Sequence, residues 1–173
     1  MTRFRIVPER STVWIDARTN VHPVHAEATG VEGFVEARLE GDRLDLSARP
    51  GGRVELAVER IRSNNALFDG ELRRRVEARR FPTIVGEVTE VREAGDGRYL
   101  VRGDLTFHGV TRTVEGTVTL SRSDPGTLRL EGEQTFDIRD FGLEPPRLLV
   151  LKAYPDVRVR VRLEARAEGA GPE

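Results

Sequence analysis

The feature that most constrains this chain is a strict alternation of apolar and charged residues near its end. Over residues 157–166, which read Val-Arg-Val-Arg-Val-Arg-Leu-Glu-Ala-Arg, every odd position is apolar and every even position is charged. Side chains on a β-strand point alternately to opposite faces, so a period of two separates an apolar face from a charged one. The segment is therefore predicted to form a strand with one face buried and the other in water.

Strand-like patterns fill most of the remaining chain. Alternation recurs in residues 31–39, 53–60 and 99–107, and turns rich in Gly, Asp or Pro separate further candidates. These candidates are residues 3–7, 12–19, 42–48, 83–91, 112–121 and 127–137. About eight long strands with short connections favour antiparallel neighbours, and their apolar faces are buried only in a closed barrel or a stacked sandwich. The pattern predicts an all-β fold and leaves both architectures open.

One segment breaks the period of two. Residues 64–80 are rich in Leu, Glu, Arg and Ala, have the capping-type residues Ser63, Asn64 and Asn65 at their start, and stop at Phe81-Pro82. A single helix is predicted there, with Leu67, Leu72 and Val76 on its apolar stripe. Its many arginines have two interpretations: a solvated face interleaved with glutamates, or a site for a diphosphate head group or an anionic membrane surface. They are Arg73, Arg74, Arg75, Arg79 and Arg80.

Composition limits the function classes. The length of 173 residues fits one domain, predicted over residues 1–166 and followed by a flexible Gly- and Glu-rich tail at 167–173. A net charge of −1 argues against nucleic-acid binding driven by bulk electrostatics, and the lack of cysteine excludes thiol chemistry. We expect a soluble, cytoplasmic chain, because residues 1–8 lack a signal-peptide core and no apolar run approaches the length of a membrane span. No cofactor is expected.

Three groups of short motifs occur in order along the chain. They are Leu67-Phe68-Asp69 with residues 80–84 (Arg-Phe-Pro-Thr-Ile), residues 103–112 (Gly-Asp-Leu-Thr-Phe-His-Gly-Val-Thr-Arg), and residues 136–142 (Phe-Asp-Ile-Arg-Asp-Phe-Gly). In order and spacing, over roughly residues 10–165, they resemble the YceI-like family of lipocalin-like polyisoprenoid-binding proteins. At Arg10-Ser11 the chain departs from the family, which usually has a His-Ser pair there.

The resemblance implies an extended eight-stranded antiparallel barrel, with the helix at its side or mouth. It further implies an apolar tunnel that binds, stores or transports an amphiphilic lipid, such as a polyisoprenoid or an isoprenoid quinone. An interior of eight strands is just wide enough for side chains or one slender ligand, which agrees with this expectation. Family members often pair, so a homodimer is compatible with the resemblance, although no exposed apolar stripe marks an interface. Contact with a membrane surface is expected to be at most transient.

Twelve apolar or aromatic residues are predicted to line the tunnel. They are Trp14, Phe34, Leu56, Ile61, Leu67, Phe68, Leu72, Phe81, Ile84, Tyr99, Leu105 and Phe107. Flat rings pack well along an alkyl chain, but ordinary core packing explains the same residues. Phe34 lies on the otherwise charged face of its strand, so its alternative is an exposed entrance or interface residue.

The three histidines are candidates for metal binding or catalysis. His22 and His25 are three apart, so on a strand they would point to opposite faces, and only a turn at Pro23 would bring them together. A three-histidine zinc site would also need His108, which is instead expected, with Gly109, to close the hairpin between residues 99–107 and 112–121. We therefore predict no metal site.

Paired carboxylates at Asp137 and Asp140 flank Arg139, and a structural ion pair is preferred to acid–base work because no nucleophile or histidine is near in sequence. Three functional hypotheses follow. The first is a non-enzymatic lipid carrier, and the second is an enzyme that uses His22, His25 or His108 as an acid–base group in the same pocket. The third is a scaffold with a filled core that works through its surface.

Overall fold

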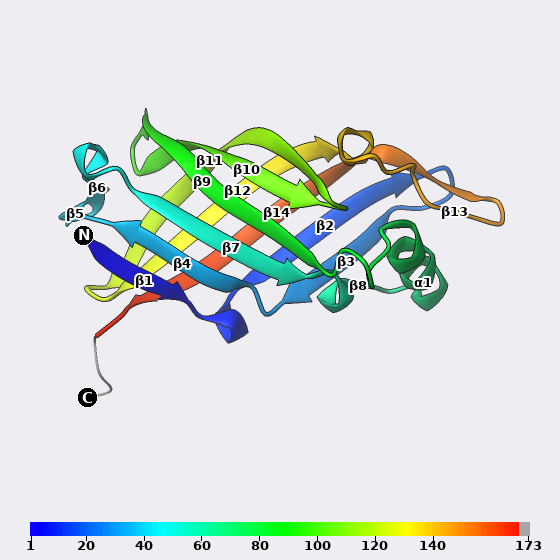
Figure 1. Ribbon diagram of the computed structural model, residues 1–173, viewed down its shortest axis with the longest axis horizontal. Helices are drawn as coiled ribbons and strands as arrows, with labels where there is room; N and C mark the ends of the chain where they lie inside the picture. Colours follow the sequence, from blue (N-terminus) through cyan, green and yellow to red (C-terminus); the bar gives the residue numbers. More distant parts are fainter. Residues whose placement is uncertain (170–173) are drawn as a thin grey trace.

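A computed structural model describes residues 1–169 of the chain, without the side chain of Leu148. Eight antiparallel strands close into an extended barrel, and the last of them pairs back with the first (Figure 1). In order around the wall they are β1 (Thr2–Ile6), β4 (Glu32–Ala37), β7 (Gly51–Ala57), β9 (Thr83–Gly95), β10 (Arg98–Phe107), β11 (Val110–Asp124), β12 (Thr127–Asp137) and β14 (Leu151–Ala167). The predicted eight-stranded barrel is confirmed, and the sandwich is excluded because the ring of strands is closed.

Three further strands lengthen one end of the barrel. They are β2 (Thr12–Thr19), β3 (Val24–Thr29) and β8 (Arg62–Ser63), which pair in the order β14, β2, β3, β8. The long strand β14 therefore pairs with β2 along its first part and with β1 along its last part. We call the end of the barrel where β14 pairs with β2 the helix end, because the single α-helix lies there, and the end where β14 pairs with β1 the β1 end.

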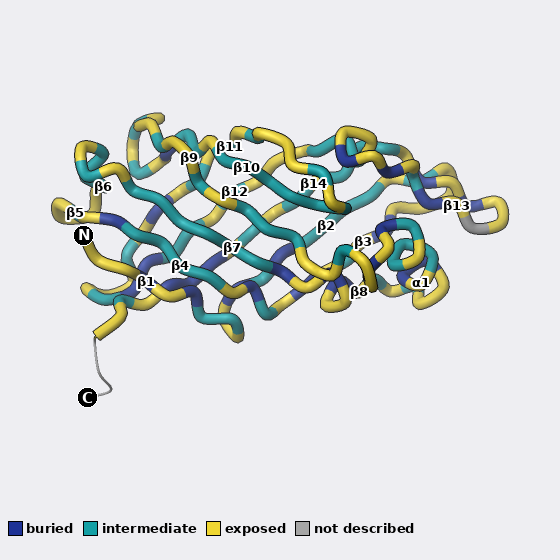
Figure 2. Tube along the Cα trace, in the orientation of Figure 1, coloured by how far each residue is buried: buried dark blue, intermediate teal, exposed yellow. Residues whose placement is uncertain are grey.

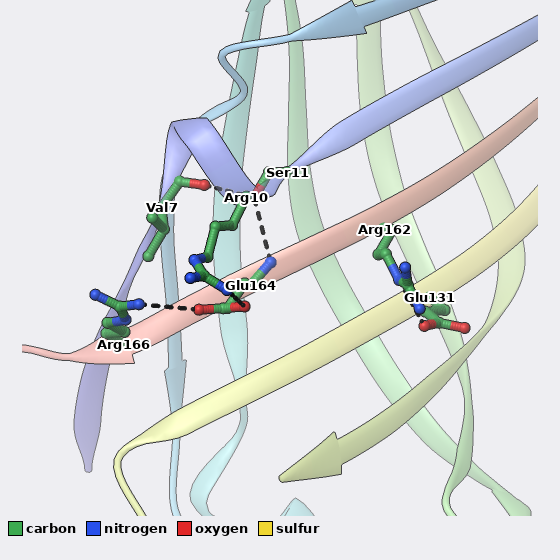
Figure 3. Close-up of polar contacts among 7 residues, drawn as sticks. All are labelled: Val7, Arg10, Ser11, Glu131, Arg162, Glu164 and Arg166. Carbon is green, nitrogen blue, oxygen red and sulfur yellow. Dashed lines mark hydrogen bonds and ion pairs between the residues drawn. The ribbon is translucent and has the colours of Figure 1, made fainter. Parts of the chain in front are cut away.

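The link between β1 and β2 is a 3₁₀ helix (Pro8–Arg10) that Ser11 anchors (Figure 3). The Ser11 side chain is fully buried. Its hydroxyl donates a hydrogen bond to the Val7 carbonyl oxygen at 2.8 Å and accepts one from the Glu164 N–H at 3.2 Å. The nearby Glu164 carboxylate lies 3.9 Å from Arg10 and 3.3 Å from Arg166. Ser11 thus joins the link between β1 and β2 to β14.

Other segments differ in detail from the predicted strands. The expected strand at 42–48 is a two-residue strand, β6 (Arg43–Leu44), which pairs with β5 (Leu39–Glu40) and precedes a 3₁₀ helix (Leu46–Ala48). The remaining short elements are β13 (Arg147–Leu148) and 3₁₀ helices at Val58–Arg60 and Ile138–Phe141. In the predicted tail, Ala167 belongs to β14, and residues 170–173 lie outside the described residues.

The single α-helix, α1 (Ala66–Arg75), is shorter than the predicted 64–80 and lies at the helix end beside β8 and β13 (Figure 1). Asn65 caps it by accepting a hydrogen bond from the Phe68 N–H at 3.0 Å. The buried carboxylate of Asp69 accepts hydrogen bonds from the Ser63 N–H and hydroxyl, which fixes the helix to β8. The helix ends early because Glu77 adopts a left-handed conformation (φ +51°) in the turn that follows.

Buried residues occur at both ends of the barrel (Figure 2), but they belong to different apolar clusters. One large apolar cluster extends from the β1 end towards the middle, and the β5–β6 hairpin covers that end where the Leu44 N–H donates to the Tyr99 hydroxyl at 2.9 Å. At the helix end, two smaller clusters attach α1 and the loops. One contains Val24, Phe68, Leu151 and Ala153, and the other Val58, Val76, Ala78 and Leu143. Among the described residues, no helix has the length and apolarity needed to span a membrane.

Candidate functional site

The inner face of the barrel changes character along β14. Its odd-numbered residues, which the alternation marks as apolar, pair with inward-facing residues of β12. Near the β1 end, Ala165 and Leu163 are buried opposite Leu128 and Leu130. Further along the same face, Val161, Val159 and Val157 are only half-buried. The inner wall is therefore tightly packed at one end and accessible towards the other.

Gln134 also indicates that the inner face is accessible in this half of the barrel. It lies on the inner face of β12, two residues beyond Gly132, and pairs with Val159 of β14, yet it is exposed to solvent. A side chain inside a closed barrel meets water only if the interior contains space of at least water size. The half of the barrel nearer α1 is consequently not filled by its own side chains.

Four glycines lie on the inner face of the barrel wall. One glycine lies on the inward phase of each of four consecutive strands, where a strand would normally place a side chain. They are Gly86 of β9, Gly103 of β10, Gly116 of β11 and Gly132 of β12. The sequence contains this signal, because each glycine occupies the apolar phase of its alternating segment.

Gly103 and Gly116 differ in how much room an added side chain would have. A Cβ on Gly103 would lie 2.4 Å from the Glu87 carbonyl oxygen, so the close approach of the backbones requires glycine there. A Cβ on Gly116 would meet only the Gln134 side chain, at 3.6–3.9 Å, which is ordinary van der Waals contact. Local packing therefore permits a side chain at Gly116, and glycine there leaves interior space unoccupied.

The structure divides the twelve residues predicted to line the tunnel. Leu56, Ile61 and Tyr99 belong to the large interior cluster, and Ile84 packs against it from the neighbouring strand. Leu105 faces inward opposite Gly86. Nearer α1, Leu72 and Phe107 pack on the cluster around Val58, and Phe68 is buried in the cluster around Val24. Contact of these eight residues with a ligand stays a prediction.

The other four do not face the interior in this way. Trp14 lies on the outer face of β2 between the inward Val13 and Ile15, and the Arg160 guanidinium stacks 5.3 Å from its ring centre. Phe34 lies on the outer face of β4 with Arg3 at 4.1 Å, which agrees with the alternative of an external position.

Leu67 points away from the barrel and is 72% exposed, whereas its neighbour Phe68 is buried. Phe81 packs edge-on against the His108 ring at 5.4 Å, in the loop after α1. Consecutive residues point to opposite faces of a strand and in different directions around a helix, so apolar character alone could not assign Trp14, Phe34 or Leu67 to the interior.

The histidines are engaged in separate local structures. His25 lies 2.6 Å from Asp16 on the outside of the barrel, and His22 contacts the Pro23 carbonyl oxygen in the turn between β2 and β3. His108 forms the tight turn between β10 and β11 with Gly109, as predicted. Its Nδ1 lies 3.0 Å from the Phe141 carbonyl oxygen, and its Nε2 lies 3.1 Å from Glu77.

The described residues contain no group of three or more His, Cys, Asp or Glu side chains able to hold a metal ion. Asp137, the last residue of β12, forms an ion pair with Arg139. Asp137 accepts hydrogen bonds from the Arg139 guanidinium at 2.6 Å and from its N–H at 2.9 Å, and both lower the pKa of Asp137. A catalytic histidine stays a hypothesis.

Arg73 differs from the other arginines around α1. Arg74 and Arg75 pair with Glu71 at 2.7 Å, as expected for a helix surface. Arg73 Nε and Nη2 are buried and have no hydrogen-bond partner within the described part of the chain. A buried donor left unpaired costs about 1–3 kcal/mol, and more when it is charged. Arg73 therefore carries two buried donors that are not used within the described part of the chain.

The closed wall, the helix α1 at one end of the barrel and the accessible inner face in the half nearer α1 together define an extended up-and-down β-barrel protein. The chain belongs to the YceI-like domain family, which it matches over residues 4–165. The resemblance seen in its short motifs is thereby confirmed.

Curated relatives are distant and longer than the matched region. A UPF0312 protein of Vibrio cholerae is 28% identical over 121 residues, which cover 62% of this chain and 59% of that protein. A UPF0312 protein of Pseudomonas syringae is 26% identical over 133 residues, which cover 73% of this chain and 65% of the relative. The chain thus spans less than two thirds of the length of these curated relatives.

Solved structures with the same fold align over nearly their whole length. BcnA of Burkholderia cenocepacia gives a TM-score of 0.76 at 14% identity, covering 92% of this chain and 98% of that one. A polyisoprenoid binding domain from Saccharophagus degradans, implicated in plant cell wall breakdown, gives 0.75 at 11% identity, covering 96% and 99%. At these identities the likeness shows a shared fold.

Proposed function

We propose that this protein carries or stores an amphiphilic lipid, such as a polyisoprenoid or an isoprenoid quinone, in the half of the barrel nearer α1. The proposal depends chiefly on Gln134, which faces inward and is nevertheless exposed, and on Gly116 beside it, where the wall has room but carries no side chain. Each buried CH₂ of a ligand contributes about 0.8 kcal/mol, so a long isoprenoid chain needs little besides apolar contact. The polyisoprenoid binding domain with the same fold supports this choice of ligand class.

The polar end of such a ligand needs a partner, and Arg73 is the group best suited to it. Its two unused buried donors match acceptor oxygens, whether those of a quinone carbonyl or of a phosphate. Hydrogen bonds to a head-group oxygen would offset the cost of the unpaired guanidinium only when ligand is bound. Arg73 would thus favour amphiphiles over plain hydrocarbons.

Mass spectrometry tests the lipid function directly. Protein purified from its own host and sprayed under native conditions is expected to retain a lipid whose mass fits an isoprenoid series. After delipidation, the protein should take up a polyprenyl phosphate supplied in detergent. A chain that carries no lipid and takes up none would leave the scaffold hypothesis in its place.

Replacing Arg73 with methionine separates head-group recognition from chain burial. The Arg73→Met variant is expected to bind polyprenyl phosphate about tenfold or more weakly, because a charge-assisted hydrogen bond is lost. Its affinity for squalene, an isoprenoid without a head group, should not change. The thermal midpoint should hold or rise, because an unpaired buried charge is removed.

The matched control is Arg74→Met, which removes an exposed guanidinium that pairs with Glu71. Titration of both variants with both probes decides the assignment. Equal weakening for phosphate and squalene, or equal effects of the two substitutions, would show that Arg73 does not hold the head group.

A further inference from the structure

The exposed apolar residues of this protein gather at one end. Six large hydrophobic side chains are exposed in the described part of the chain, and five of them belong to the helix end. These five are Val21, Leu67, Leu149, Val150 and Tyr154, whereas the sixth is Met1. Leu149 and Val150 are 93% and 81% exposed at the turn between β13 and β14, which projects beyond the barrel (Figure 1).

Hydrogen bonds hold this turn against the neighbouring loop. The Asn20 side-chain amide donates to the Val150 carbonyl oxygen at 2.8 Å and accepts from the Lys152 N–H at 2.7 Å. The Asn20 N–H donates in turn to the Lys152 carbonyl oxygen at 3.1 Å. The loop that contains Val21 is therefore tied to the turn that contains Leu149 and Val150, and we call these three residues the apolar tip.

Folding stability does not explain a leucine at the centre of the tip. Leu149 has φ +53°, a left-handed conformation that disfavours residues with a bulky side chain and suits Gly, Asn or Asp. Its side chain also gains almost no burial within the chain. An apolar residue retained at both costs points to a use outside the folded monomer.

The surrounding charge narrows the choice of partner. Three segments at the helix end, 17–24, 66–80 and 144–152, together contain eight Lys or Arg and four Asp or Glu in a chain of net charge −1. The loops of the opposite end, residues 38–50, 93–98 and 122–126, contain five and six. A protruding apolar tip among excess cations matches the interface of an anionic bilayer, where cations meet head groups and apolar side chains enter the acyl boundary.

We propose that the helix end docks on anionic lipid bilayers, with Leu149 and Val150 inserted at the interface. The inference deepens the proposed lipid carriage and rests on it, because the accessible half of the barrel is at this same end. Docking there lets a lipid pass between bilayer and barrel without crossing bulk water. The cationic segments orient the molecule, and the apolar tip holds it in place.

Vesicle binding of the full chain tests this proposal. Flotation is measured with vesicles of phosphatidylcholine containing about 30% phosphatidylglycerol, and with phosphatidylcholine alone. We expect binding to the anionic vesicles that weakens severalfold in about 0.5 M NaCl, where surface charges are screened. The double variant Leu149→Asp/Val150→Asp is expected to bind at least about tenfold more weakly. Aspartate tolerates the left-handed turn, so the variant should keep its thermal midpoint.

The control adds the same charge at the opposite end. Ser121→Asp/Ser123→Asp changes two residues of β11 near the hairpin to β12 and should leave vesicle binding within about twofold of the unchanged protein. Equal losses in both variants, or equal binding by the tip variant and the unchanged protein, would overturn the proposal. The proposal would also be overturned if the unchanged protein did not bind vesicles but formed a dimer that the tip substitutions dissociate. The tip would then contact a second copy of the chain.

The two proposals fail in different ways. Uptake of polyprenyl phosphate from detergent does not require a bilayer, so the tip variant should retain it. Normal uptake without vesicle binding overturns docking alone, whereas vesicle binding without uptake overturns lipid carriage.

Discussion

Placing a leucine at Gly116 is expected to abolish uptake of a polyprenyl chain while leaving the barrel folded. Gly116 faces inward in the accessible half of the barrel, and a Cβ there meets only the side chain of Gln134. A leucine would extend across the space proposed for the ligand. Because leucine suits a strand better than glycine, the free energy of unfolding should hold or increase.

The matched control is Gly116→Ala, which adds one methyl group at 3.6–3.9 Å from its neighbours and leaves most of the space open. Its uptake should be close to that of the unchanged protein. Native mass spectrometry after incubation with polyprenyl phosphate measures both variants, and urea unfolding verifies their stability. Full uptake by a stably folded Gly116→Leu protein would place the ligand elsewhere.

A second substitution is expected to affect the fold itself. Gly33 in β4 has φ +136°, and a Cβ on it would lie 1.9 Å from the Arg53 carbonyl oxygen on β7. Alanine at this position must separate the two strands, so we expect Gly33→Ala to lower the free energy of unfolding by about 4 kcal/mol or more. Urea denaturation monitored by circular dichroism gives the difference.

Gly41 provides a comparison without a collision. It also has a positive φ, +64°, but nothing lies within 4 Å of the place that an added methyl group would occupy. Gly41→Ala therefore carries backbone strain without a collision and should cost only about 1–2 kcal/mol. Similar losses for both variants would mean that φ, and not the approach of Arg53, makes glycine necessary at position 33.

Much of the wall could be predicted because its periodicity is local. The strand at 157–166 alternates without exception, and its inward face is the one that the sequence marks as apolar. Strand β3 could not be predicted in the same way because its inward residues include Ala26 and Ala28, and alanine is a weak indicator of strands. Closure depends on the pairing of β1 with β14, about which neither segment carries local information.

The candidate site was harder to predict for physical reasons. Aromatic character suggests a place in the tunnel wall, but Trp14 lies outside, where stacking with Arg160 stabilises it. Gly116 occupies the apolar phase of its segment, but a search for apolar and aromatic side chains passes over it because it has none. Arg73 could not be distinguished from the arginines around it, because the rotation of the helix against the barrel decides which guanidinium is buried, and the local sequence does not fix that rotation.

The length of β14 has a consequence for how the protein is made. This strand pairs with β12 along one edge and with β2 and β1 along the other, so the ring closes only after residues 151–167 have been synthesised. Until then, the open edges of β1, β2 and β12 remain templates for pairing with other chains. Contacts between the first and last strands also predict slow folding, because distant segments must meet before the barrel is complete. During that interval the nascent chain is at its most prone to aggregation.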